Sequence, residues 1–129
     1  MIYDSPAAGI ILDSTALAEL PASFFLQTLV KTHIEQDRRV VVPVVALSHA
    51  ANTSRITYAR IHHRGVTTID YTAGIVDDIA DLAREATGPV ALDVLHCAYE
   101  AVRTGYYPIL TGQPQAYAHI PHALHLEPL

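Results

Sequence analysis

Two aspartates, far apart in the chain, are the residues of this sequence best suited to chemistry. Asp13 directly follows the apolar run Ile10 to Leu12, and Asp93 lies in a late stretch with helical periodicity. A short continuous apolar run is typical of a strand buried on both faces of a parallel sheet. Such a strand has no solvent-facing side for a charge, so we expect Asp13 at its carboxyl end, where open α/β sheets bind ligands. A loop or capping acid would explain Asp13 equally well, and both interpretations stay open.

Histidines extend the set of candidate ligands around these two aspartates. Asp93 and His96 are three residues apart on a predicted helix and therefore share a face. Together with Asp13 and His49 they would form a mixed oxygen and imidazole site, which suits manganese, nickel or zinc better than magnesium. The competing prediction is that His96 packs against the sheet and that His49 has no ligand role. Cys97 is separately predicted to be a small buried hydrophobe.

The elements that must position these residues follow from hydrophobic periodicity. Buried strands are predicted at 10–12, 40–42, 66–69 and 108–111, with a small fifth strand near 124–126. Helices are predicted at 15–20, 24–38, 73–86 and 89–104, after Pro43, and as short pieces within 52–65 and 113–119. One strand alternates with two helices along the chain. This order predicts a three-layer α/β/α sandwich with a mainly parallel, five-stranded sheet.

Local residue preferences place the ends and faces of several helices. Ser14 is expected to cap the 15–20 helix. Pro89 is expected to open the last long helix, which ends before Gly105. Phe24 and Phe25 are predicted to be core residues, with Phe25 on the face toward the sheet.

Length, charge and cysteine content restrict the class of protein. The chain has 129 residues, half of them hydrophobic, which predicts a single domain over residues 1–129. Its net charge of −5 does not favour long, non-specific contact with nucleic-acid phosphate, although eight histidines would shift that balance in mildly acidic solution. No apolar stretch approaches the roughly 20 residues that span a bilayer. Residues 1–8 lack the basic region of a secretory signal, and the lone Cys97 excludes an internal disulfide, so we expect a cytoplasmic protein without a membrane partner.

The segment 52–65 is the basic and aromatic part of the chain. The simplest interpretation is a solvated helical face. The functional interpretations are a contact with substrate phosphate through Arg55 and Arg60, or a subunit interface. Ile56, Tyr58 and Ile61 interrupt this polar stretch, and hiding them against a second copy would favour a homodimer.

Four segments together resemble the PIN domain, the nuclease domain of VapC-type toxins. They cover nearly the whole chain in the order of that family and are 9–17 (GIILDSTAL), 42–49 (VPVVALSH), 92–98 (LDVLHCA) and 108–111 (PILT). The resemblance implies a sheet whose first strand is central. The second and third strands then lie on one side of it, and the fourth and fifth on the other.

The resemblance also implies a carboxylate site for Mg²⁺ or Mn²⁺, in which the metal activates water for attack on an RNA phosphodiester. Asp13 matches the first acid of the family and Asp93 the third, whereas His49 and Gln113 stand where the second and fourth acids are expected. The candidate site residues, from the resemblance and from the residue patterns above, fall into three groups: Asp13 and Asp93 as catalytic and metal-binding residues; His49 and His96 as further candidate metal ligands; and Ser14, Thr111, Gln113, Arg55 and Arg60 as substrate contacts.

Because half of the acidic set is replaced, we expect a degenerate member of the toxin–antitoxin nucleases, with weak or no metal-dependent RNA cleavage. The alternative is a non-catalytic RNA-binding or protein-interaction module on the same scaffold. The nuclease prediction and the RNA-binding alternative make RNA a partner, whereas the protein-interaction alternative does not require it. The resemblance adds an antitoxin-like protein and a homodimer.

Two other α/β folds fit the sequence poorly. A phosphoacceptor receiver domain with Asp70 as its acceptor would need an acidic pair after the first strand and a lysine after the last. Here Asp13 is followed by Ser14, and the only lysine is Lys31. A dinucleotide-binding fold is also disfavoured, because no Gly-x-Gly-x-x-Gly follows a predicted strand.

Overall fold

Five parallel strands form the centre of the structure, a computed structural model that describes residues 9–129. The strands are β1 (Gly9–Leu12), β2 (Arg39–Pro43), β3 (Thr67–Ile69), β4 (Ile109–Thr111) and β5 (Leu126–Pro128). Their order in the sheet is β3-β2-β1-β4-β5, and every neighbouring pair is parallel. The predicted sheet is therefore confirmed, with the first strand at its centre. The expectation about a secretory signal in residues 1–8 lies outside the described residues.

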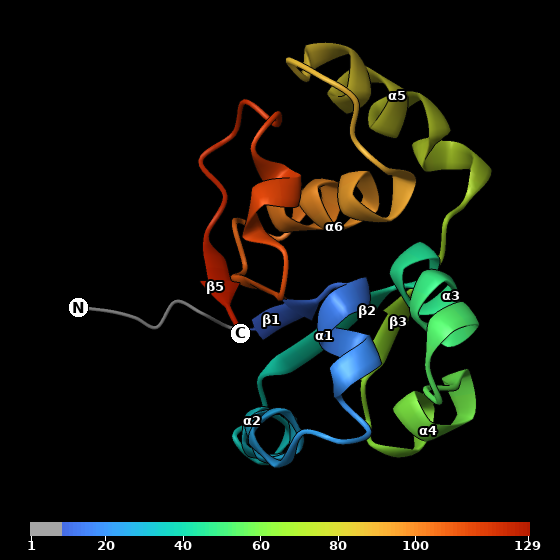
Figure 1. Ribbon diagram of the computed structural model, residues 1–129, viewed down its shortest axis with the longest axis vertical. Coiled ribbons are helices and arrows are strands. Elements are labelled where there is room, and N and C mark those ends of the chain that lie inside the picture. Colours follow the sequence, from blue (N-terminus) through green and yellow to red (C-terminus); the bar gives the residue numbers. More distant parts are fainter. Residues whose placement is uncertain (1–8) are drawn as a thin grey trace.

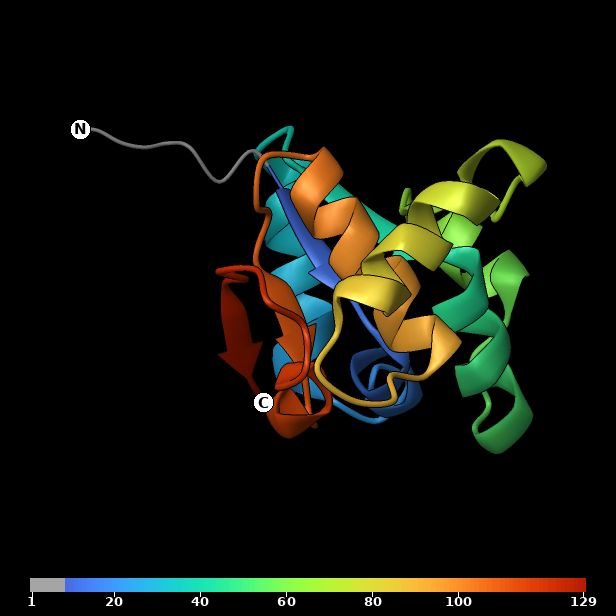
Figure 2. The ribbon, with the colours of Figure 1, turned by 90° about the horizontal axis from the view of Figure 1, so that it is seen from above.

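Helices cover both faces of this sheet, which confirms the three-layer sandwich (Figures 1 and 2). α6 (Leu92–Arg103) and α5 (Val76–Glu85), which a 3₁₀ turn at Ala73–Ile75 precedes, lie on one face, and α2 (Phe24–Glu35) lies on the other. α1 (Ser14–Glu19) packs against α3 (Val44–Thr53), and α4 (Tyr58–His63) follows α3. A short 3₁₀ helix, η2 (Pro114–Tyr117), follows β4. Between residues 9 and 129, no helix has the length and apolar composition needed to cross a membrane.

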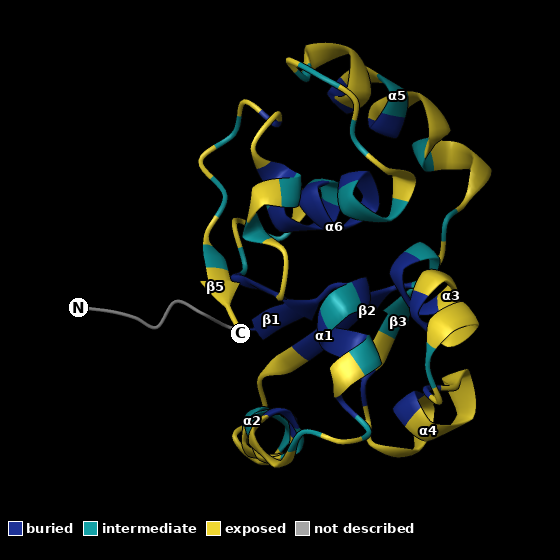
Figure 3. Cartoon of the chain, viewed as in Figure 1, coloured by how far each residue is buried: buried dark blue, intermediate teal, exposed yellow. Residues whose placement is uncertain are grey.

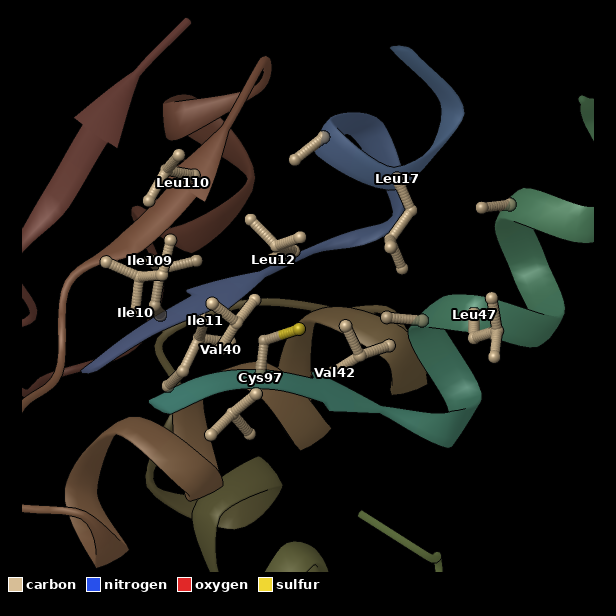
Figure 4. Close-up of a cluster of buried hydrophobic side chains, with 14 of the residues drawn as sticks. Ile10, Ile11, Leu12, Leu17, Val40, Val42, Leu47, Cys97, Ile109 and Leu110 are labelled. Carbon is tan, nitrogen blue, oxygen red and sulfur yellow. The ribbon is translucent and has the colours of Figure 1, made fainter. Parts of the chain in front are cut away.

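β1 is buried along its whole length because it is the central strand of a sheet covered on both faces. Figure 4 shows its side chains among those of the neighbouring strands and of α6, with Cys97 close to β1 and β2. Cys97 is fully buried and free, as predicted. Gly9 opens the strand where two backbones approach closely. A Cβ at Gly9 would lie 2.6 Å from the carbonyl oxygen of Arg39.

The prediction that Phe24 and Phe25 are core residues is wrong. Their exposed fractions are 82% and 65%. Ser23 caps α2, so the two phenylalanines occupy its first turn, while Leu26 and Val30 are the residues that the helix buries against the sheet. Figure 3 shows that most of the outer surface of α2 is exposed. The apolar stripe that points inward is therefore narrower than the sequence periodicity predicts.

The predicted start of the last long helix is also wrong. α6 begins at Leu92, not at Pro89, because Ala91 has an extended backbone with φ −67° and ψ 151°. The preceding loop is tied to the end of η2, where the amide of Thr87 donates to the carbonyl of His119 at 2.9 Å. Pro89, Val90 and Ala91 of this loop line the same cleft as Asp13. The helix ends as predicted, with Gly105 in a left-handed conformation at φ 82°.

Ile56 and Ile61 do not form a surface patch. Their exposed fractions are 3% and 0%, and both belong to the hydrophobic core of the chain itself. The apolar residues that favoured a dimer through segment 52–65 are thus satisfied within one copy. Tyr58 is the member of that group that stays exposed, at 54%.

Candidate ligand cleft

A cleft of about 490 Å³ opens at the carboxyl ends of the central strands, between α1, α3 and the start of α6. Four residues singled out in the sequence line it, each from a different element: Asp13 after β1, His49 on α3, Asp93 in the first turn of α6, and Gln113 after β4. Parallel strands bring these positions to one edge of the sheet. The remaining lining consists of Ser14, Thr15, Ala18, Thr53, Pro89, Val90, Ala91, Val94 and Ala116.

Asp13 is a buried helix cap whose two carboxylate oxygens both accept hydrogen bonds from the protein. Its exposed fraction is 4%. Oδ1 accepts from the amides of Thr15 and Ala16 at 3.0 and 3.1 Å, and from the hydroxyl of Thr15 at 2.6 Å. Oδ2 accepts from the hydroxyl of Tyr117 at 2.9 Å. Asp13 thus satisfies backbone amides that every helix N-terminus leaves without an intrahelical partner.

Ser14 does not cap α1, contrary to the prediction. The backbone of Asp13 is extended, which puts the carboxylate of Asp13 in the capping position and makes Ser14 the first helical residue. The Ser14 hydroxyl instead donates to Oδ2 of Asp93 at 2.8 Å. This contact joins the start of α1 to the start of α6 inside the cleft, and it occupies one oxygen of the second aspartate.

Tyr117 is a site residue that the sequence interpretation missed. It lies on η2 and has an exposed fraction of 3%. Burial, with smaller contributions from Cys97 and Asp13, raises the pKa of the Tyr117 hydroxyl, so this group stays protonated and remains a donor to Asp13. No local pattern distinguishes this tyrosine from the other six of the chain, because its role depends on a contact between residues 104 positions apart.

The loop after β4 is fixed by two further hydrogen bonds. Thr111 is fully buried, and its hydroxyl oxygen accepts from the amide of Gln113 at 2.9 Å. The amide of Gly112 donates to the hydroxyl oxygen of Thr15 at 2.7 Å. Thr111 therefore lies behind the cleft, outside its lining, and shapes the turn that presents Gln113.

His49 and Thr53 extend the cleft along α3. They are four residues apart on a helix and share a face, and both line the cleft. His49 is exposed. This spacing is a signal in the sequence that would have identified Thr53 together with His49.

His96 does not reach the cleft. Its side chain is fully buried, and its ring meets the ring of Tyr71 edge to face at 5.4 Å between centroids and 87° between planes. Neither ring nitrogen has a hydrogen-bond partner among residues 9–129. Burial lowers the pKa of His96, and the carboxylate of Glu100 partly opposes this shift. The prediction that His96 is a metal ligand of the cleft is therefore wrong, and the competing prediction, that His96 packs inside the protein, is confirmed.

Arg55 and Arg60 also lie outside the cleft lining. Arg55 follows α3, Arg60 is on α4, and both are exposed. A role for them in contacting a ligand therefore requires a ligand that extends beyond the cleft.

The donor set of the cleft does not fit the Mg²⁺ or Mn²⁺ ion that the family resemblance implies. In the part of the chain that the structure describes, no three side chains of His, Cys, Asp or Glu are grouped for a shared metal ion. Both Asp13 oxygens accept protein donors, and one carboxylate oxygen of Asp93 accepts no hydrogen bond among residues 9–129. His49 and Gln113 supply neutral groups. Hard divalent cations need several oxygen ligands, preferably charged ones.

The first prediction concerns Asp13 as a structural residue. Asp13→Ala should lower the free energy of unfolding by about 2 to 4 kcal/mol, because it removes a helix cap and leaves the buried Tyr117 hydroxyl without its acceptor. Asp13→Asn keeps a capping oxygen and should lose less than half of that amount. Chemical denaturation measures both. Asp70→Ala, an exposed aspartate, is the control, and an Asp13→Ala variant as stable as this control would contradict the structural role.

The second prediction concerns His96 and pH. Because the pKa of His96 is lowered in the folded protein, the unfolded chain takes up the proton more readily. The stability contributed by neutral His96 is complete above its ordinary pKa of 6.5 and is lost as pH falls through the lowered pKa. Thermal melts from about pH 8 to about pH 5 should therefore show a flatter pH dependence for His96→Leu than for the natural protein. His63→Gln, an exposed control, should keep the original slope. Parallel curves for the natural protein and His96→Leu would rule the mechanism out.

No known family model matches the chain, and no curated protein matches its sequence. The resemblance to PIN domains consequently rests on the four short sequence segments. The strand order agrees with that resemblance.

Proposed function

We propose that this chain is a PIN-like RNA-binding protein with weak or no metal-dependent cleavage. The observation that carries the proposal is the engagement of both Asp13 oxygens by protein donors, with the Tyr117 hydroxyl on the oxygen that α1 leaves free. A nuclease of the PIN type needs its first carboxylate for a cation. Here that carboxylate holds the fold together, and two of the four acidic positions are neutral side chains.

The remaining groups of the cleft suit a ribonucleotide better than a metal ion. Thr53 and Gln113 offer hydroxyl and amide groups for phosphate and base edges, whereas the hydroxyls of Ser14 and Thr15 already donate to Asp93 and Asp13. Asp93 keeps a carboxylate oxygen that is able to accept from a ribose 2′-hydroxyl, the group that distinguishes RNA from DNA. The buried free thiol of Cys97 is consistent with the reducing cytoplasm, where we place this role.

The third prediction tests this proposal by restoring the missing acids. The natural protein should leave single-stranded RNA largely intact in Mg²⁺ or Mn²⁺. His49→Glu combined with Gln113→Asp adds two carboxylates to the cleft lining and should strengthen divalent-ion binding, measured by calorimetry. RNA cleavage, measured on gels, should rise in the same variant.

A matched control separates the site from overall charge. His63→Glu combined with Gln36→Asp makes the same changes at two exposed positions outside the cleft and should not alter divalent binding. Robust Mg²⁺-dependent cleavage by the natural protein, abolished by Asp13→Asn, would show that the chain is an active nuclease and would refute the proposal.

A second candidate function, protein interaction, is favoured by the exposed start of α2. Phe24 and Phe25 stand beside two further hollows, one toward Arg64 and one toward β5. Burying large aromatic side chains is a main source of interface energy. We propose a second copy of this chain as the occupant. The antitoxin-like partner that the resemblance implies is the competing occupant of the same side chains.

The fourth prediction is therefore a homodimer that depends on α2. Light scattering at tens of micromolar should give the mass of a dimer, and Phe24→Ser with Phe25→Ser should give a monomer of 14.0 kDa. Thr28→Ser with Lys31→Arg, conservative changes on the same helix, should remain dimeric. If the natural protein is monomeric at this concentration, the homodimer is refuted, and the antitoxin-like protein remains as the proposed partner.

A further inference from the structure

Charge is unevenly distributed along this acidic chain. Residues 38–69 contain no aspartate or glutamate, although the whole chain has 13. The same segment holds more than half of the lysines and arginines, namely Arg38, Arg39, Arg55, Arg60 and Arg64, together with His49, His62 and His63. Although the protein is negative overall, the side chains of residues 38–69 therefore contribute no negative charge that would repel a polyanion.

The fold turns much of this region outward around α4. Ile56 and Ile61 anchor the segment in the core, and the Thr57 hydroxyl caps the helix by accepting from the amide of Arg60 at 3.3 Å. All residues of α4 except Ile61 are exposed, as Figure 3 shows. We call the exposed group Arg55, Tyr58, Arg60, His62 and His63 the α4 basic face. Tyr58 and His62, four residues apart, share one side of the helix, and Arg60 lies on another. None of its members takes part in a salt bridge among residues 9–129.

An aromatic pair lies within the α4 basic face. The rings of Tyr58 and His62 are stacked, with centroids 5.5 Å apart and planes at 19°. More than half of Tyr58 remains exposed at 54%. A flat ring held by a neighbour and open to solvent provides a platform on which an unpaired base is able to stack. A base within a duplex is already stacked on its neighbours.

The α4 basic face continues directly from the cleft. Thr53, the last residue of α3, lines the cleft, and Arg55 follows two residues later. Figure 1 shows α4 next in the chain after α3, on the same side of the molecule. Arg55 and Tyr58 are therefore the first basic and the first aromatic residues that follow the cleft-lining Thr53 in the chain.

We propose that the α4 basic face is a second binding region for single-stranded RNA, one or more nucleotides away from the cleft. Arg55 and Arg60 bind the phosphate backbone, and Tyr58, supported by His62, stacks on one base. This inference rests on the RNA-binding function proposed above and deepens it. It also accounts for how an acidic protein with two carboxylates, Asp13 and Asp93, in its cleft holds a polyanion.

The fifth prediction follows from this assignment and uses fluorescence anisotropy with a short labelled single-stranded RNA in EDTA. Arg55→Ala combined with Arg60→Ala should weaken binding and flatten its dependence on salt by about 1.4 units of log Kd per log salt, because two phosphate contacts are lost. Tyr58→Ala should weaken binding about fivefold or more, whereas Tyr58→Phe keeps the ring and should retain the affinity. A duplex of the same sequence should bind more weakly, without a Tyr58 effect.

The matched control is Arg38→Ala combined with Arg39→Ala. It removes the same charge at exposed positions at the start of β2, the end of the sheet opposite the cleft, and should leave the salt dependence unchanged. RNA binding that is unaffected by all α4 variants would overturn this inference but leave the proposed function standing. No RNA binding by the natural protein would instead overturn both. A third outcome is that an acidic peptide displaces the RNA while Tyr58→Ala binds RNA as tightly as the natural protein. This outcome would point to a protein partner and also overturn the inference.

Discussion

The hydrogen bonds of the Asp13 carboxylate are the interaction on which the rest of the site depends. They join three parts of the chain: the end of β1, the first turn of α1 and the 3₁₀ helix η2. Thr15 extends the connection, because its hydroxyl donates to Asp13 and accepts from the amide of Gly112. A buried carboxylate is costly unless its oxygens are satisfied. Asp13 and Thr15 line the cleft, and with the Tyr117 hydroxyl they accordingly form a closed polar network on that side.

This network changes the meaning of the family resemblance. An aspartate at the carboxyl end of a central strand is well placed both to cap a helix and to hold a cation. Tyr117 favours the first role, because its protonated hydroxyl occupies the oxygen that the capping amides leave free. The neutral side chains of His49 and Gln113 act in the same direction. The hydrogen bond from Tyr117 and the neutral side chains of His49 and Gln113 therefore all act against metal binding. Together they support our proposal of binding without efficient cleavage.

The parts of the structure that depend on local patterns were predictable. The buried run that ends at Asp13 is a central strand, and the strands place Asp13, His49, Asp93 and Gln113 around one cleft. The sequence could not show which of two adjacent polar residues caps α1, because this depends on the backbone angles of Asp13. Nor could it show the bond from Tyr117, which joins distant positions.

The errors in predicted burial share one cause. Phe24 and Phe25 are exposed, whereas Ile56 and Ile61, in a polar segment, are buried. For the two phenylalanines residue type predicted burial, and for the two isoleucines the polar surrounding segment predicted a surface position. The number of large side chains that a helix buries depends on how much of its surface its neighbours cover, and this is a property of the whole fold. The exposed surfaces that result, at α2 and at α4, are those that our proposals assign to partners.

The central claim is that the cleft and α4 bind RNA without a metal ion. The most direct measurement is the Kd for one single-stranded RNA, determined once in excess EDTA and once in excess Mg²⁺ at matched ionic strength, with the RNA recovered and sized afterwards. The account predicts the same Kd in both conditions and RNA of unchanged length. Binding that requires Mg²⁺, or RNA that is cut when Mg²⁺ is present, would contradict it.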